Sequence, residues 1–264
     1  MNLKKILLAS SIAALASIST TASAASVLGI TWDENSNVDF TTTGVIWEQT
    51  PSATVGSQLT GYGAFTLLNN NTVATYGGGS KILTFSFTVE LTSFNLNPFT
   101  ADPNDGFFTY KGVNEGIGLS HVNVFSTDIA NYDVTNLSTQ TLANAQSGDV
   151  FLTSSLTAVG LSGTGTNFAS PNAKSGTGTG WLEANGGAAL AFLDTNTQVD
   201  PLGVLADFTF SSSFNQAPNQ FPLGFPYTGT VTVTGQSINV PEPASIALLG
   251  LGLLGLGLRR RNQA

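Results

Sequence analysis

The stretch KILTFSFTVEL, from Lys81 to Leu91, alternates apolar and polar side chains almost without a break. Its apolar members fall at every second position, and they are Leu83, Phe85, Phe87, Val89 and Leu91. Only Ile82, on the polar face, departs from the pattern. Because successive side chains of a strand point to opposite faces of its sheet, this period of two predicts a strand with one buried face.

The same alternation recurs through the middle of the chain. Val231 and Val233 alternate with threonines, and Phe208 and Phe210 repeat the Phe-x-Phe spacing. Further strands are expected at 27–32, 38–47, 59–68, 107–111, 119–126, 150–156 and 188–193. Clusters of Gly, Pro, Asn and Asp separate them, at 77–79, 103–106, 185–187 and 200–203.

Two segments lack a clear strand pattern. The segment 129–146 is expected to hold a short helical turn at 141–145, and the Gly/Thr/Ser-rich segment 162–180 reads as a long loop. Many strands, regular turns and few helices predict one all-β domain. We expect an antiparallel β-sandwich of the jelly-roll or lectin-like type.

The last 25 residues, from Val240, have three parts in a fixed order. The triplet Pro241, Glu242, Pro243 precedes an uncharged apolar run at 244–258, and the cluster Arg259, Arg260, Arg261 follows. As a helix the run is roughly 22 Å long, which is shorter than the roughly 30 Å hydrocarbon core of a bilayer. Arginines at the far end would stay in the cytoplasm by the positive-inside rule. A plain C-terminal membrane helix is the alternative to a processed tail.

This ending resembles the PEP-CTERM sorting signal of exported proteins in Gram-negative bacteria that make exopolysaccharide. The resemblance implies that an exosortase-type membrane protease recognises Pro241, Glu242 and Pro243 and cuts near them. The arginine cluster would be the cytoplasmic stop. The protein would then be anchored only transiently in the inner membrane before it reaches the cell surface or extracellular matrix.

The N-terminus independently indicates export. Lys4 and Lys5 precede an apolar stretch at 6–18, and Ala22-Ser23-Ala24 has the small residues of a signal-peptide cleavage site, so we place the cut after Ala24. The expected organisation is a signal peptide at 1–24, an exported domain at 25–239 and the sorting signal, with its hydrophobic helix, at 240–264.

The exported domain is strongly acidic. It holds three lysines and fifteen acidic residues, a formal charge of −12, because the other basic residues lie in the two signals. Such a charge repels phosphate backbones, so nucleic acid is excluded as a partner. The chain has no cysteine, so no disulfide stabilises the domain.

The residues suited to catalysis are few. His121 is the single histidine, no cysteine is available as a nucleophile, and no Gly-x-Ser-x-Gly elbow occurs. Glycoside hydrolysis needs only two carboxylates, but no local motif selects a pair. We therefore expect a protein that is not an enzyme, and we rank a secreted glycan-active enzyme third among the alternatives.

Calcium is the metal that the sequence would suit best. Asp33, Asn35, Asn37 and Asp39 offer oxygen ligands at alternate positions, as hard cations require. The EF-hand pattern fails, since Val38 and Gly44 stand where it needs Gly and Glu. The alternative is a solvated turn, which is also the simpler interpretation of the Asp/Asn loop at 102–106.

A glycan contact is the second candidate site. Trp181 could stack on a sugar ring, with Glu183 and Asn185 beside it to bond the hydroxyl groups. The alternative is that Trp181 covers the core from a loop. Exopolysaccharide would be the partner in the setting that the sorting signal implies.

The preferred function from the sequence is a structural or adhesive role in biofilm or floc formation at the cell exterior. The segments 193–197 and 206–214 are faintly similar to flocculation-associated PEP-CTERM proteins. The alternative is a carbohydrate-binding module that engages exopolysaccharide, assisted by calcium.

Overall fold

The computed structural model describes residues 24–33, 40–114, 121–136, 139–217, 222 and 224–238. The expected signal peptide, up to residue 23, and the expected sorting signal lie outside these residues. Strands dominate the described part, as expected, and they are long: β6 (Lys81–Leu96) and β9 (Asp149–Thr166) have 16 and 18 residues.

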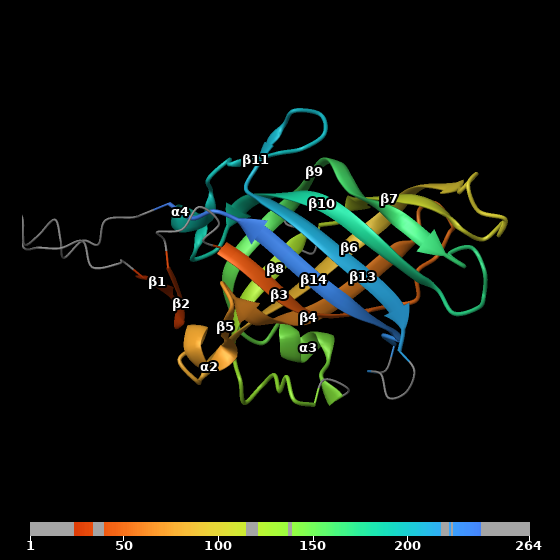
Figure 1. Ribbon diagram of the computed structural model, residues 1–264. Coiled ribbons are helices and arrows are strands. Elements are labelled where there is room, and N and C mark those ends of the chain that lie inside the picture. Colours follow the sequence, from red (N-terminus) through yellow and green to blue (C-terminus); the bar gives the residue numbers. More distant parts are fainter. Residues whose placement is uncertain are drawn as a thin grey trace, which may run out of the picture.

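The strands close into an antiparallel barrel with eight strand positions (Figure 1). Neighbours around the barrel follow the order of the chain, and the last strand pairs with the first, for example Tyr227 with Glu48. The other barrel strands are β3 (Phe40–Glu48), β4 (Gln58–Leu68), β7 (Gly106–Gly112), β8 (Val122–Asp128), β10 (Ser175–Gly186), β13 (Phe208–Gln216) and β14 (Tyr227–Gly235).

One position of the barrel is shared by two strands. β7 pairs with the second half of β6, and β8 pairs with its first half, from Lys81 to Phe87. Both strands also pair with β9 on their other side. β7 and β8 therefore act as one interrupted strand between β6 and β9.

The expected β-sandwich is wrong, because the sheet closes on itself. Residues of β4 pair with β3 on one side and with β6 on the other, and β14 pairs with β3, so the barrel strands have no break between them. Period-two alternation is the same for a sandwich and a barrel, since both bury one face of each strand. Closure depends on the pairing of β14 with β3, which no local pattern encodes.

The side chains that alternate in Lys81–Leu91 behave as predicted on the inner face. Leu83, Phe85, Phe87, Val89 and Leu91 all belong to the core inside the barrel. Ile82 faces outward, where it joins a second buried cluster with Trp47, Tyr62 and Tyr132. The segment after β8, with α3 (Leu142–Ala145), covers this outer face, so the exception in the pattern marks a covered wall (Figure 1).

Glycines inside the strands make room for phenylalanine rings in the narrow barrel. Gly63 is paired with Phe85 and Gly61 with Phe87, and in each case the ring lies where a Cβ atom of the glycine would be. Gly180 is related to Phe210 in the same way. The high content of both residue types therefore reflects packing of large rings against bare backbone.

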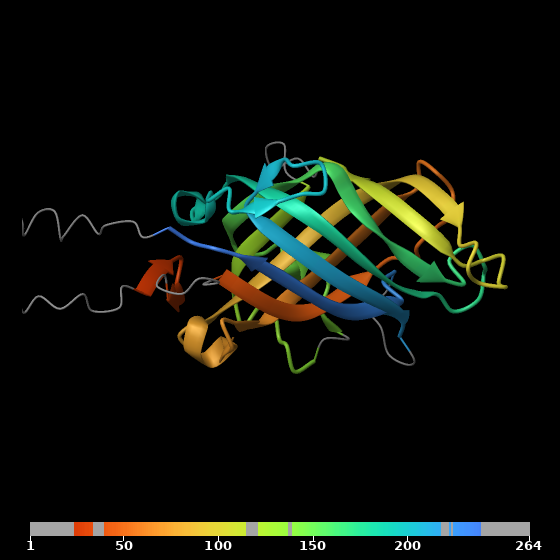
Figure 2. The same cartoon turned by 45° about the horizontal axis from the view of Figure 1, so that its top comes forward.

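Aromatic side chains fill both ends of the barrel. At one end Trp32, from the hairpin of β1 (Ala24–Val27) and β2 (Ile30–Asp33), packs edge-on against Phe40 and Phe151. At the other end Phe168, in the connection between β9 and β10, stacks on Phe94 and Phe108. Figure 2 shows the first hairpin and this connection at opposite ends of the molecule.

Two local expectations are also wrong. In the Gly/Thr/Ser-rich segment 162–180 only the connection at 167–174 is a loop. The rest forms the paired ends of β9 and β10, because its glycines alternate with Ser and Thr on a strand. The expected strand at 188–193 contains α4 (Leu190–Leu193), since a short apolar run does not distinguish helix from strand.

The helical turn at 141–145 is confirmed as α3, with Thr141 as its capping residue. The remaining short elements are β5 (Asn71–Thr72), α2 (Val73–Tyr76), β11 (Gln198–Val199) and β12 (Leu205–Ala206).

Candidate functional site

Glu48 places a carboxyl group inside the barrel. It is the last residue of β3 and follows Phe40, Thr42 and Ile46 on the inward face of that strand. Its side chain is 5% exposed, and Oε2 has no hydrogen-bond partner among the described residues. Burial raises the pKa of Glu48 to about 8, so the group is mostly protonated at neutral pH.

Tyr110, on β7, is the second polar group in this region. It is 2% exposed, and its hydroxyl group also lacks a partner within the described part of the chain. Burial raises the pKa of Tyr110 above its usual range, and the charge of Glu48 adds to the rise. Two polar groups that lack partners thus lie together inside an apolar barrel, an arrangement that usually has a functional reason.

Glu48 lines an internal cavity of about 70 Å³. The other walls are mainly apolar and come from strands all around the barrel, including Phe65, Phe87, Val124, Leu156, Leu182 and Val231. Glu48, Leu161 and Ser212 also line a smaller space of about 10 Å³, which Tyr110 and Phe168 border. Glu48 therefore stands between the main cavity and the end of the barrel that Phe168 fills.

The side chains predicted to contact a glycan share the outer face of β10. Trp181 and Glu183 are half-buried, while Leu182 between them points into the core. The Asn185 amide is already engaged, since Oδ1 accepts from Thr153 Oγ1 at 2.7 Å and Nδ2 donates to Ser155 Oγ at 2.7 Å. The structure thus brings the three predicted residues to one strand face, with Trp181 and Glu183 as the available members.

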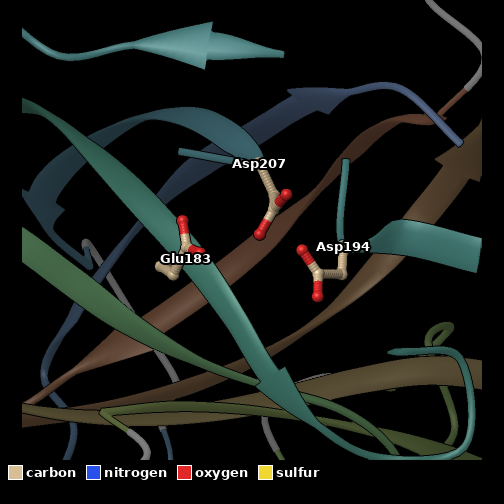
Figure 3. A group of neighbouring side chains, drawn as sticks. All are labelled: Glu183, Asp194 and Asp207. Atoms are coloured by element: carbon tan, nitrogen blue, oxygen red, sulfur yellow. The ribbon is translucent and has the colours of Figure 1, made fainter. Parts of the chain in front are cut away.

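Glu183 also belongs to a group of three carboxylates that sequence reasoning missed. One oxygen each of Glu183, Asp194 and Asp207 lies within 4.8 Å of the others, and the three side chains point toward one another (Figure 3). Burial and the two neighbouring acids raise the pKa of Glu183. Residues 183, 194 and 207 are far apart in sequence, so no spacing motif could reveal the group.

Asp207 has a structural role in this group. Its side chain is fully buried, Oδ2 accepts from the Ala184 N–H at 2.7 Å, and Oδ1 accepts from the N–H groups of Thr195 and Asn196 at 2.5 and 2.7 Å. One carboxylate therefore holds the connection after α4 against β10. Three charge-assisted bonds account for its burial without a metal ion.

We expect Asp207→Ala to lower the free energy of unfolding by about 3 kcal/mol, because one buried and two part-buried N–H groups lose their acceptor. Asp207→Asn keeps one acceptor oxygen, so its loss should be smaller. Denaturant unfolding measures both variants, and Asp194→Asn, at an exposed position, is the matched control. An effect of Asp207→Ala as small as that of the control would contradict this role.

The predicted calcium ligands are mostly outside the described residues. Asp33 ends β2, whereas Asn35, Asn37 and Asp39 belong to the segment 34–39, which the structure does not describe. The calcium site therefore stays a prediction. In the second Asp/Asn loop, Asp102 Oδ1 accepts from the N–H and the side-chain amide of Asn104, both at 2.8 Å, which is the bonding of an ordinary turn.

His121 is tied to the backbone of the barrel. Its Nδ1 accepts from the Leu156 N–H at 3.1 Å, and burial lowers the pKa of the imidazole. A ring nitrogen that accepts a backbone hydrogen bond is unavailable as the general base of a triad.

Comparison with known proteins recognises the C-terminal signal. Residues 239–261 match the family described as the PEP-CTERM protein-sorting motif. The chain therefore carries an exosortase-dependent sorting signal, as the sequence indicated, which means export and a transient stay in the membrane. No curated protein and no solved structure matches the chain. The similarity to flocculation-associated proteins gains no support from these comparisons. Within the described residues, no helix is long and apolar enough to cross a bilayer.

Proposed function

We propose that the exported barrel is a non-enzymatic protein of the surface or extracellular matrix of a Gram-negative bacterium, with an adhesive role in biofilm or floc formation. The observation that carries this proposal is the hairpin of β11 and β12, at 198–206. It exposes four large apolar side chains within seven residues: Val199, Leu202, Val204 and Leu205 are 57%, 70%, 48% and 54% exposed. Exposed apolar groups that cluster in this way are typical of interaction sites.

The hairpin projects from the barrel wall (Figure 1). A short two-stranded hairpin is only marginally stable without packing, so its apolar side chains gain most when a partner covers them. The exported domain as a whole carries a formal charge of −12, which would keep the barrels apart in solution. An apolar contact on such a surface gives local adhesion without general aggregation.

The sorting motif supports the location. β14 ends at Gly235, and Ser237 accepts a hydrogen bond from Trp32 Nε1 at 3.0 Å, so both described ends of the chain lie at the same end of the barrel. A precursor held by its C-terminal tail would therefore keep this end toward the membrane. Phe168 and the loops beside it would face outward.

We expect the double variant Leu202→Ser, Leu205→Ser to reduce floc or biofilm mass as strongly as deletion of the gene, because it removes the apolar contact. The thermal unfolding temperature should stay within a few degrees of that of the unaltered protein, since both side chains are exposed. Phe99→Ser, 89% exposed in the loop after β6, is the matched control for loss of exposed apolar surface. Normal flocs from the double variant, with normal export, would refute the adhesive hairpin.

A carbohydrate-binding role is the second candidate, because Trp181 and Glu183 share the outer face of β10, where both side chains are partly exposed. Exopolysaccharide would be the ligand. A gel that contains the polysaccharide of the producing cell should then retard the protein, and Trp181→Ala should abolish the retardation. Equal mobility of the two proteins would remove this candidate.

A further inference from the structure

We propose that the barrel interior binds a small unbranched alkylammonium ion, with the alkyl chain in the apolar cavity and the ammonium group at Glu48. This site is inside the barrel, so it is independent of the adhesive hairpin and of the outer face of β10. Three features of the structure support it: the shape of the cavity, the carboxyl group that ends it, and the charge of the domain.

The cavity has the size and shape of a short chain. A water-sized probe needs about 10–15 Å³, so a cavity of about 70 Å³ has room for roughly five to seven non-hydrogen atoms. Thr42 and Glu48 both line it and lie six residues apart on β3, a distance of about 20 Å along the strand. A small cavity whose lining extends along this length of β3 suits a linear molecule better than a ring or a branched one.

The apolar wall and the single carboxyl group define the chemistry of the ligand. Phenylalanine, leucine and valine side chains make up most of the wall and offer no bonds to a polar chain. Glu48 Oε2 has no partner in the described structure, and the hydroxyl group of Tyr110 is the other unpartnered group beside the smaller space. Thr42 Oγ1, which lines the main cavity farther along β3, also lacks a partner among the described residues. A ligand that is apolar over most of its length and donates hydrogen bonds at the Glu48 end fits this wall.

The charge of that end follows from the ionisable groups nearby. Among the described residues, Glu48 is the only acid or base that lines the main cavity, and Tyr110 is the only other titratable residue that lines the smaller space. Burial keeps the carboxyl group of the empty site protonated, so a cation that binds takes the place of this proton. The exported domain carries a formal charge of −12, which raises the local concentration of cations at its surface.

All three lysines of the domain are engaged elsewhere, so none neutralises Glu48. Lys81 pairs with Asp128 at 2.9 Å and Lys111 with Glu90 at 2.8 Å. Lys174 is buried, and its Nζ donates to the carbonyl oxygens of Phe168 and Ser170 at 2.5 and 2.6 Å. No lysine of the domain is therefore placed to balance the carboxylate that forms when Glu48 gives up its proton, and an alkylammonium ion would balance it.

The test is calorimetric titration of the protein, purified from the exporting cell without detergent, with n-pentylammonium chloride at pH 7. n-Hexane and 1-pentanol have the same number of non-hydrogen atoms without the charge, and 2-methyl-2-butylammonium has the charge on a branched chain. We expect saturable binding of n-pentylammonium, at least tenfold weaker binding of the other three, and at least a tenfold loss of affinity in Glu48→Gln. Glu183→Gln, on the outer face of β10, should keep the affinity within twofold.

Proton release separates a bound ion pair from simple filling of the cavity. Because burial raises the pKa of Glu48 to about 8, an ammonium ion that binds at pH 7 must displace the carboxyl proton. Titration in buffers of different ionisation enthalpy should therefore show nearly one proton released per ligand, and none in Glu48→Gln. The proposal is overturned if n-pentylammonium does not bind, if it binds without proton release, or if hexane or pentanol binds as tightly.

Discussion

The substitution Glu48→Gln is expected to raise the free energy of unfolding, compared with the unaltered protein at the same pH. This gain should be about 4 kcal/mol larger above pH 8 than at pH 4. The cause is the buried carboxyl group. An unfolded glutamate has a pKa near 4.5, whereas burial raises the pKa of Glu48 to about 8. Between these values the folded protein holds one proton more than the unfolded chain.

The sign of the effect follows from proton linkage. A raised pKa in the folded state means that the stability is fully present below pH 4.5 and is lost as the pH rises toward 8. Each pH unit in that interval costs about 1.4 kcal/mol, so the total is roughly 4 to 5 kcal/mol. Glutamine cannot ionise, so Glu48→Gln should not lose this stability, although its buried amide adds a small penalty that is constant with pH.

Denaturant unfolding at several pH values between 4 and 9 measures this difference. His121, whose pKa burial lowers, contributes with the opposite sign, but its contribution is the same in both proteins and cancels in the comparison. Glu183→Gln is the control, since Glu183 is more exposed and should change the pH profile much less. Parallel stability curves for Glu48→Gln and the unaltered protein would mean that Glu48 is ionised and solvated.

The strands were predictable where alternation is strong, and the fold was not. The pattern from Lys81 to Leu91 correctly predicts which side chains face inward. Sequence alternation reports that a strand has a buried face, but it does not report which strand lies beside it. The pairing of Thr230 with Val45, which closes the barrel, joins residues 185 positions apart, and only the complete packing determines it.

Glycine has a different role in this barrel from the one that its abundance in 162–180 suggests. The segment 162–180 was expected to be a loop because glycine is common in turns. In this barrel Gly163 lies opposite Phe108, and Gly180 opposite Phe210, so the glycines are strand residues that accommodate a ring. A search for glycine at alternate positions, with phenylalanine at similar spacing elsewhere, would have identified these strands.

The candidate sites show the same limit. Trp181, Glu183 and Asn185 share a strand face because their spacing is two, and spacing is visible in a sequence. Glu48 could also have been found, since it continues the inward positions of β3 by one step beyond the predicted strand. Sequence alone does not show that Glu48 is isolated inside the barrel, or that Asp194 and Asp207 meet Glu183. Both facts depend on contacts between distant segments of the chain.

Replacing Pro241, Glu242 and Pro243 together by alanine should reduce release of the protein from the inner membrane at least tenfold. The sorting motif at 239–261 indicates that an exosortase acts on this tail. Without its recognition triplet the precursor should not be cleaved. The apolar run would remain in the bilayer, and the barrel would be held at its outer surface.

The arginine cluster explains why the uncut chain should stay in the inner membrane. Moving one arginine through the centre of a bilayer costs about 2.5–3.5 kcal/mol on insertion scales, so Arg259, Arg260 and Arg261 together oppose escape of the tail by about 8–10 kcal/mol. Replacing the three arginines by serine in the triplet variant should therefore restore loss from the membrane, but without cleavage. Mass spectrometry of the C-terminus of the membrane and exterior fractions distinguishes these outcomes. If the unaltered protein itself were recovered from the membrane with all three arginines, and none outside the cell, the tail would be a permanent anchor and the proposed location outside the cell would be wrong.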